Sequence, residues 1–234
     1  MKQVFLSRKG IETKEVPEPI VEKGKILIKN LYSCVSPGTE ISSLNSIKKN
    51  ILKKIFEKPQ VLKNLIGVLK KRGIKNTSGI VSRKLTEFYE LGYSSSGIVE
   101  KVGEGVKNFS KGDLVACSGG GFASHAEKIL VPENFVVKTK RKENLSLYST
   151  VALGSIAMHA VRRSKTSIGE TTLVVGLGFI GQITMQILRA AGVEVYGIDP
   201  NDDFLKKSKK DDFLNVYRSF EDLSKRISQD MISV

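Results

Sequence analysis

The sequence predicts a β domain over residues 1–150, followed by an α/β domain with a parallel sheet over residues 151–234. Short strand-like runs separated by glycine and proline dominate the first part of the chain, which is typical of a small closed β structure. Helical periodicity interrupts these runs at residues 46–86 and returns at residues 146–163. Strand, helix and strand alternate after that point, as in a parallel sheet with crossover helices.

Branched residues and turn signals predict the strands of the β domain. Residues 3–7 and 11–16 flank a turn at Gly10, and a longer strand at residues 25–35 is closed by a turn at Pro37-Gly38. Four more strand-like runs follow the helical stretch, each bounded by turn residues: "SGIVEKVG", "GDLVACSG", "AEKILVP" and "NFVVKTK".

The net charge of +14 is concentrated in one segment. Residues 41–85 contain twelve Lys and Arg residues against Glu57 alone, which makes the segment +11 and leaves +3 for the rest of the chain. Such a segment attracts nucleic acid, anionic membrane or an anionic substrate. Its basic stretch has a single aromatic residue, Phe56, and no nucleic-acid-reading motif. We therefore predict that the apolar stripe of the insert packs on the protein while its lysines stay solvated, with substrate steering as the next alternative.

Composition narrows the class of protein further. No stretch approaches the roughly 18 apolar residues that a membrane helix needs. Cys34 and Cys117 cannot form a disulfide framework, and no CxxC pair is present to hold zinc. The N-terminus lacks the pattern of a secretory signal. These features predict a reduced, cytoplasmic protein.

A glycine-rich turn in the α/β domain carries the clearest functional signal. The predicted buried strand Leu173-Val174-Val175 leads into Gly176-Leu177-Gly178-Phe179-Ile180-Gly181, a helix follows at about 180–191, and the next strand ends at Asp199. In this G-x-G-x-x-G pattern the first glycine permits the turn, the second lets the backbone approach a pyrophosphate, and the third allows close packing of the helix. The amides that begin the helix bind phosphate, and Asp199 would accept hydrogen bonds from ribose hydroxyls and repel a 2′-phosphate. The pattern predicts a Rossmann unit that binds NAD in preference to NADP.

Several motifs in order resemble the medium-chain dehydrogenase/reductase superfamily. They are "LGYSSSGIVEKVGEGVKNFSKGDLVA", "AEKILVPEN" and the Rossmann unit. This resemblance implies the alcohol dehydrogenase layout, in which a GroES-like β-barrel domain precedes a doubly wound nucleotide-binding sheet. A narrower resemblance, carried by "VSPGTEISSL", the helical insert and "ALGSIAMHAVRRS", is to bi-domain oxidoreductases that continue into a Gfo/Idh/MocA-type dehydrogenase module.

The metal positions of zinc-dependent relatives are altered in this chain. Where those relatives have a cysteine, a His-Glu pair and a third ligand, this sequence has Ser36-Pro37, Tyr93-Ser94 and Val151. Because hydroxyls are poor zinc ligands, we predict that the chain binds no catalytic zinc. The resemblance places Tyr93 in the cleft, where its phenol would donate a hydrogen bond to the substrate oxygen. Alternatively, its ring only fills the space that zinc occupies in the zinc-dependent relatives. The resemblance also implies that the Thr39 hydroxyl takes part in a proton relay. Alternatively, this hydroxyl only caps the backbone of the local turn. His125 and His159 match no ligand spacing, so surface or packing roles are predicted for both.

Two hypotheses on function remain open at the level of sequence. The first is an NAD-dependent, zinc-independent oxidoreductase that passes hydride between nicotinamide and an alcohol or carbonyl substrate, such as a sugar or polysaccharide precursor. The second is a non-catalytic dinucleotide-binding or interaction fragment. Only the first half of a Rossmann sheet is predicted before the chain ends, so a homo-oligomer or another chain that supplies the missing strands is expected. A small-molecule substrate is predicted as well, whereas nucleic acid and membrane are not predicted as partners.

Overall fold

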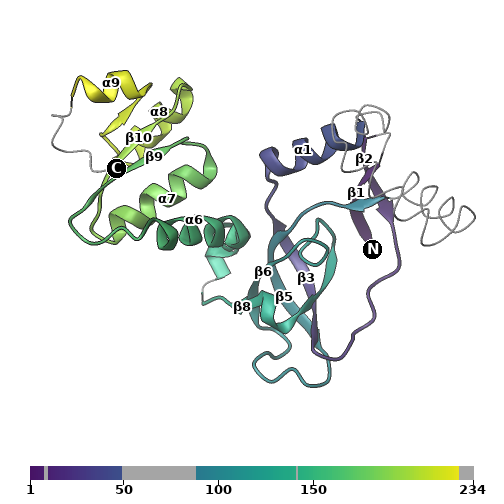
Figure 1. Cartoon of the computed structure of the whole chain (residues 1–234). Helices are drawn as coiled ribbons and strands as arrows, with labels where there is room; N and C mark the ends of the chain where they lie inside the picture. Colours follow the sequence, from purple (N-terminus) through teal and green to yellow (C-terminus); the bar gives the residue numbers. More distant parts are fainter. Residues whose placement is uncertain (8–9, 49–87, 141, 227–234) are drawn as a thin grey trace, which may run out of the picture. The chain divides into compact units, whose positions relative to one another are not determined.

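The structure is a computed structural model that describes residues 1–7, 10–48, 88–140 and 142–226. Most of the predicted helical insert at 46–86 therefore lies outside the described residues. The chain divides into two compact units, Met1–Val151 and Ala152–Val234 (Figure 1). We describe each unit by itself, as a GroES-like β unit and a Rossmann-like α/β unit.

Two sheets build the β unit. The smaller sheet has the order β2-β1-β4 and the larger one the order β7-β3-β5-β6-β8, and a bridge between Gln3 and Ala126 joins strand β1 to the segment before β7. The pairing within both sheets is antiparallel. The strands are β1 (Lys2–Ser7), β2 (Gly10–Glu15), β3 (Lys25–Ser33), β4 (Tyr89–Glu90), β5 (Ser94–Val102), β6 (Leu114–Ser118), β7 (Lys128–Pro132) and β8 (Val136–Lys138).

Alternation along the strands of the larger sheet produces the core of the β unit. Ile26 and Ile28 on β3 face the same side, where they meet Val99 of β5 and Val115 of β6. Each of these side chains is almost fully buried. The period of two that predicted these strands thus places one face of each in a shared apolar core.

Three consecutive serines of β5 are fully buried in the β unit. Because neighbours in a strand point to opposite faces, Ser94 and Ser96 point the same way, and both donate hydrogen bonds to backbone carbonyls around helix α5 (Leu145–Tyr148). Ser94 Oγ lies 2.6 Å from the Ser149 carbonyl oxygen, and Ser96 Oγ bonds the Leu145 carbonyl oxygen. The serines of "LGYSSSG" therefore anchor the segment that leads toward the α/β unit.

The region around Pro37 corrects a prediction. Instead of a turn at Pro37-Gly38, helix α1 (Pro37–Lys48) begins there. Proline suits the first helical position because its ring presets φ and its missing N–H has no intrahelical partner there. Glu40 accepts a hydrogen bond from the Ser36 amide at 3.1 Å, which satisfies a donor at the helix start. The prediction that the strand ends before these residues is confirmed, whereas the prediction that they form a turn is wrong.

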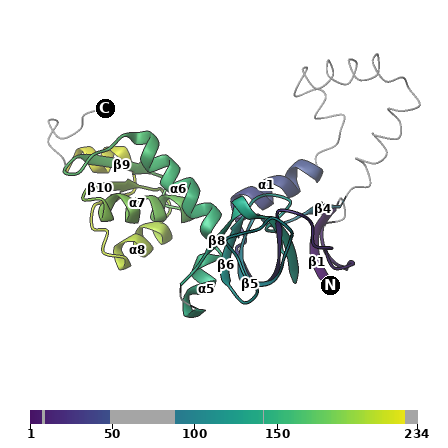
Figure 2. The ribbon, with the colours of Figure 1, turned by 90° about the horizontal axis from the view of Figure 1, so that it is seen from below.

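The α/β unit has a three-stranded parallel sheet in the order β11-β10-β9. On the central strand, Val195 faces a cluster with Met185 and Leu188 of α7, whereas Tyr196 and Ile198 face Leu223 of α9. Helices thus cover both faces of the sheet, as in a doubly wound fold (Figure 2). The elements of this part are α6 (Val151–Ser164), β9 (Thr171–Val175), α7 (Phe179–Ala190), β10 (Glu194–Ile198), α8 (Asp202–Lys210), β11 (Val216–Tyr217) and α9 (Phe220–Ser224).

Strand β9 is less buried than predicted. Among the described residues it pairs with β10 alone and forms the edge of the sheet, and the Val175 side chain at its end is 76% exposed. The prediction of a fully buried strand is wrong for this reason, since a central strand needs neighbours on both sides. Short 3-10 turns at Glu133–Phe135 and Lys142–Asn144 complete the described elements.

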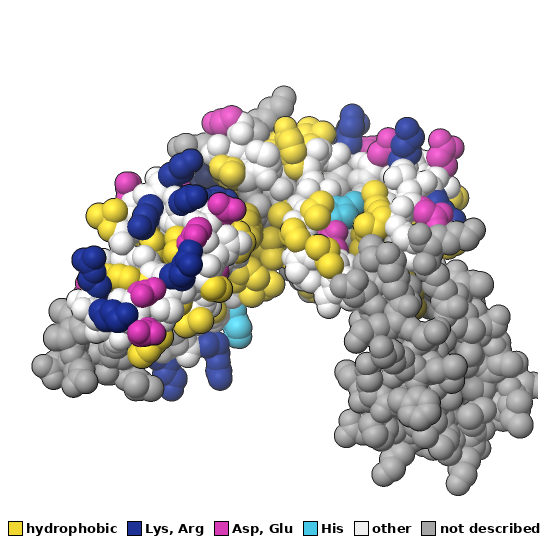
Figure 3. Space-filling model, turned by 90° about the horizontal axis from the view of Figure 1, so that it is seen from above, with side chains coloured by type: hydrophobic (Ala, Val, Ile, Leu, Met, Phe, Trp, Pro, Cys, Tyr) yellow, Lys and Arg dark blue, Asp and Glu magenta, His cyan; other side chains and the backbone are white. Residues whose placement is uncertain are grey.

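Exposed basic side chains are prominent on the α/β unit (Figure 3). Lys207, Lys209 and Lys210 lie in the last turn of α8, and Asp202 and Asp203 lie in its first turn, so the charges of this helix complement its dipole. None of the helices within the described ranges is long and apolar enough to cross a membrane.

Candidate functional site

The glycine turn between β9 and α7 has the geometry that its sequence predicts. Gly176 has φ +94°, a left-handed conformation that side chains with a Cβ rarely adopt, and its amide donates to the Ile198 carbonyl at 2.8 Å. A Cβ on Gly181 would lie 1.9 Å from the Gly176 carbonyl oxygen, whereas one on Gly178 would meet no atom within 4 Å. The first and third glycines therefore allow the fold itself, and the second leaves open space beside the backbone.

The start of helix α7 offers backbone donors to an anion. Gly178 is the N-cap residue and provides no side-chain cap, so the first amides of the helix lack that partner. The side chain of Gln182 donates to the Leu177 carbonyl at 3.0 Å and braces the turn from inside. A helix N-terminus with unpaired amides and the positive end of the dipole is suited to a phosphate group.

Asp199, at the end of β10, is hydrogen-bonded to the glycine turn. Its Oδ2 accepts from the Leu177 amide at 2.7 Å, its Oδ1 accepts from the Asn201 amide at 2.8 Å, and the residue is 7% exposed. An ionised carboxylate has about four acceptor positions, so two remain beyond these amides. The contacts hold the carboxylate beside the turn while leaving it capacity for further donors.

Arg218, which follows the strand beside Asp199, is engaged in an ion pair. The Asp199 amide donates to the Tyr217 carbonyl at 3.1 Å, and Arg218 is the next residue after β11. Arg218 forms an ion pair with Asp202, and this hydrogen-bonded pair lowers the pKa of the Asp202 carboxyl and raises that of the guanidinium.

The two predicted catalytic hydroxyls lie in different elements of the β unit. Tyr93 is half-buried immediately before β5, and its carbonyl accepts from the Gly119 amide at 2.9 Å. Thr39 is exposed in the first turn of α1, where its Oγ1 lies 3.4 Å from Ser36 Oγ. No described contact joins the Tyr93 and Thr39 side chains to each other, so their roles stay predictions.

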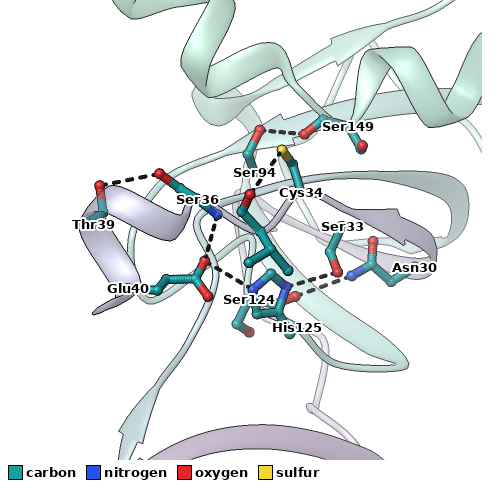
Figure 4. A network of polar contacts seen from close by, with 11 residues as sticks. Asn30, Ser33, Cys34, Ser36, Thr39, Glu40, Ser94, Ser124, His125 and Ser149 are labelled. Carbon is teal, nitrogen blue, oxygen red and sulfur yellow. Dashed lines mark hydrogen bonds and ion pairs between the residues drawn. The ribbon is translucent and has the colours of Figure 1, made fainter. Parts of the chain in front are cut away.

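A polar network around His125 was missed by the sequence interpretation (Figure 4). The imidazole contacts Ser33 Oγ at 2.8 Å through Nδ1 and Glu40 Oε1 at 3.2 Å through Nε2. The side chains of His125 and Glu40 are 10% and 11% exposed. These partners lie 92 and 85 residues from His125, so no local pattern could have indicated them. One feature of the sequence could have drawn attention to this residue, because His125 is the single histidine of the predicted β domain at residues 1–150.

The described side chains do not fit a zinc site. Within the part of the chain that the structure describes, no three His, Cys, Asp or Glu side chains lie close enough together to hold a metal ion. Burial, and secondarily the charge of Glu40, raises the pKa of the Cys34 thiol, which disfavours the thiolate that zinc binds. Burial raises the pKa of the Cys117 thiol to about 12. We derive no step through a metal, and zinc independence stays a prediction.

Comparison with known proteins shows which family model and which relatives this chain resembles. Residues 72–141 match the family described as Alcohol dehydrogenase GroES-like domain. The quinone oxidoreductase of Rattus norvegicus is 37% identical over 125 residues, which cover 51% of this chain and 37% of the relative. The (R,R)-butanediol dehydrogenase of Bacillus subtilis is 28% identical over 147 residues, which cover 51% of this chain and 42% of the relative. Over this part of its length the chain is similar to oxidoreductases of the medium-chain dehydrogenase/reductase superfamily.

Solved structures extend the likeness of this chain to both units. A quinone oxidoreductase from Coxiella burnetii has a TM-score of 0.70 at 19% identity, covering 97% of this chain and 65% of that one. A mycobacterial protein solved in complex with NADPH has a TM-score of 0.68 at 20% identity, covering 95% of this chain and 60% of that one. At such identities the likeness concerns the fold alone. The chain spans less than half the length of the curated relatives it matches.

Proposed function

We propose that this chain is the dinucleotide-binding and GroES-like part of an NAD-dependent oxidoreductase. The observation that carries the proposal is the glycine turn held to Asp199, because the turn presents helix amides to a diphosphate and the carboxylate lies beside it. The mycobacterial protein of the same fold that was solved with NADPH supports a dinucleotide as the ligand class.

Charge favours NAD over NADP in this proposal. A 2′-phosphate on the adenosine ribose would meet the carboxylate of Asp199, and like charges in a part-buried site repel. Arg218, which could otherwise attract that phosphate, is already paired with Asp202. Hydroxyl groups of an unmodified ribose can instead donate to the free acceptor positions of Asp199.

We expect Asp199→Asn to lower the preference for NADH over NADPH by about tenfold, which corresponds to about 1.4 kcal/mol. The amide oxygen can still accept from the Leu177 amide, so the turn is retained while the charge is removed. Dissociation constants from cofactor fluorescence titrations measure the ratio. Asp203→Asn is the matched control, because Asp203 is an exposed acid in the first turn of α8. A ratio that is the same in wild type and Asp199→Asn would remove Asp199 from cofactor selection.

We assign hydride transfer between nicotinamide and an alcohol or carbonyl carbon, without zinc. In this proposal the Tyr93 phenol donates a hydrogen bond to the substrate oxygen and Thr39 belongs to a proton path. Tyr93→Phe is expected to reduce turnover about tenfold or more at unchanged NADH affinity, because one donor to the developing charge is lost. Unchanged turnover in that variant would exclude Tyr93 from the mechanism.

The relatives support a hydroxylated small molecule as the substrate class. Their names include butanediol, sorbitol, idonate and xylulose enzymes as well as quinone oxidoreductases. A sugar or polysaccharide precursor fits most of these names, and the resemblance to bi-domain oxidoreductases points in the same direction. The substrate assignment therefore rests on analogy between relatives and not on a described pocket.

A non-catalytic dinucleotide-binding piece is the second candidate. Among the described residues β9 is an edge strand and Val175 is exposed, which leaves the edge beside the glycine turn able to pair with a further strand. In this candidate the glycine turn binds a dinucleotide and the chain carries out no reaction itself. NADH binding without turnover of sorbitol or 2,3-butanediol by the full chain would support this candidate over the first.

A further inference from the structure

The His125 imidazole has a hydrogen-bond partner at each ring nitrogen. Nδ1 lies 2.8 Å from the Ser33 hydroxyl at the end of β3, and Nε2 lies 3.2 Å from the Glu40 carboxylate on α1. Glu40 also accepts from the Ser36 amide through the same oxygen at 3.1 Å. The Glu40 side chain is mostly buried, whereas Ser33 is exposed. The chain of contacts therefore runs from a shielded carboxylate to a hydroxyl that solvent or substrate can reach.

The backbone around His125 is held from several sides. The His125 amide donates to the Leu91 carbonyl at 2.7 Å, and its carbonyl accepts from the Val4 amide at 2.8 Å. Asn30 donates through Nδ2 to the carbonyls of the residues on either side of His125, Ser124 and Ala126, at 3.2 and 3.1 Å. Such bracing fixes an imidazole in one orientation, which a ring that merely fills space does not need.

A close approach between His125 and Gly92 shows how little freedom the ring has. A Cβ on Gly92 would lie 2.7 Å from the His125 amide nitrogen and 2.9 Å from Nδ1, and Gly92 has φ +93°. The glycine directly before Tyr93 thus makes room for the imidazole. The network contacts the glycine that precedes Tyr93 and shares helix α1 with Thr39.

The partners decide which nitrogen carries the proton. An ionised carboxylate only accepts hydrogen bonds, so Nε2 must be the protonated nitrogen of the neutral ring. Nδ1 is then an acceptor and takes the hydroxyl proton of Ser33 in its hydrogen bond. This is the acid–imidazole–hydroxyl order of a hydroxyl-activating triad, with the roles of the two ring nitrogens exchanged.

We propose that Glu40, His125 and Ser33 form a proton relay that ends at the Ser33 hydroxyl and serves the alcohol or carbonyl oxygen of the substrate. This inference rests on the proposed oxidoreductase function. In alcohol oxidation, the substrate hydroxyl gives its proton to Ser33 Oγ as Ser33 gives its own proton to His125 Nδ1. A nicotinamide dinucleotide held by the glycine turn and Asp199 would, in its oxidised form, accept the hydride from the substrate carbon, and the substrate would become a carbonyl compound. Glu40 stabilises the imidazolium that forms, and carbonyl reduction reverses each transfer.

The electrostatic surroundings of the relay are simple within the described residues. Glu40 is the charged partner of His125, and the neighbouring titratable group is the Cys34 thiol, whose pKa is raised by burial and by Glu40. A neutral thiol at physiological pH leaves Glu40 as the group that compensates a protonated His125. The relay therefore has one acid, one base and one exposed hydroxyl.

Nitrogen-15 NMR of the full chain labelled at histidine tests the assignment directly. The chain has two histidines, and His159, exposed on α6, serves as the internal control. At a pH where the rings are neutral, His125 is expected to show the tautomer protonated at Nε2, and His159 a mixture of both tautomers. Ser33→Ala should shift the Nδ1 resonance of His125 and leave that of His159 unchanged. A His125 protonated at Nδ1, or one that does not respond to Ser33→Ala, would overturn the relay.

Kinetics distinguish a relay from a structural network. With sorbitol or 2,3-butanediol and NAD, Ser33→Ala is expected to lower kcat about 100-fold at unchanged NADH affinity, while Ser33→Thr restores most of it. A wild-type kcat in Ser33→Ala would mean that the network has only a structural role, and it would refute the relay. A chain that binds no NADH would instead refute the proposed function, whatever tautomer the NMR spectra show.

Discussion

Gly181→Ala is expected to destabilise the α/β unit by about 3 kcal/mol or more, because the added methyl group would collide with backbone atoms. The added Cβ would lie 1.9 Å from the carbonyl oxygen of Gly176 and 2.9 Å from its carbonyl carbon. Real atoms do not approach so closely, and the obstacle is backbone, so a side-chain rotation cannot relieve the clash. Gly176 cannot retreat easily either, because its amide is bonded to Ile198 and its φ is left-handed.

Urea unfolding followed by circular dichroism measures this loss, and Gly178→Ala is the matched control. A Cβ on Gly178 would meet no atom within 4 Å, and its φ of −63° suits alanine, so stability should change by less than about 0.5 kcal/mol. The same methyl group would occupy the space through which a diphosphate approaches the helix amides, so NADH should bind at least about tenfold more weakly. Normal NADH affinity in Gly178→Ala would contradict the proposed role of the turn, even if Gly181→Ala unfolds.

Gly97→Ala is expected to disrupt the β unit to a similar extent, about 3 kcal/mol or more. Gly97 lies in β5 opposite Asn30 of β3, next to an irregularity in the register of the two strands. A Cβ there would lie 2.1 Å from the Lys29 carbonyl oxygen and 3.0 Å from the Ile28 side chain. The strands would have to separate at the centre of the larger sheet, where Ile28 and Val99 form the core.

Gly120→Ala is the matched control for the β unit, because it has open space around its Cβ and no left-handed φ. Loss of the cooperative transition in Gly97→Ala, together with a wild-type midpoint in Gly120→Ala, is the expected result of urea titrations. Wild-type stability in Gly97→Ala would mean that the two strands are not held together as closely at this point as the structure indicates.

Local patterns accounted for much of the fold. The spacing of three glycines and one acid predicted the strand, the turn, the helix and the second strand, and helix α7 lies at Phe179–Ala190 where 180–191 was predicted. Turn residues placed the strands of the β unit within a few residues of their observed ends. These features depend on backbone conformation and on the period of apolar residues, and both are properties of short segments.

Other features depended on partners far along the chain. The sequence predicted that a strand ends before Pro37-Gly38. Only the structure shows that a helix begins there, with the Ser36 amide bonded to Glu40. Ser94 stands at a metal position of zinc-dependent relatives, yet Ser94 and Ser96 bond backbone carbonyls and anchor the segment around α5. Their role depends on carbonyls about 50 residues away, which no local pattern encodes.

By itself, the sequence determined the glycine turn between β9 and α7, since the glycines and the terminal acid that shape it lie within one continuous stretch. Only the tertiary structure decided that His125 lies between Ser33 and Glu40, because three segments distant in sequence must fold together before their side chains meet. Short-range backbone geometry is encoded locally, whereas the orientation of an imidazole is set by hydrogen bonds that exist only after the sheets and helix α1 have packed.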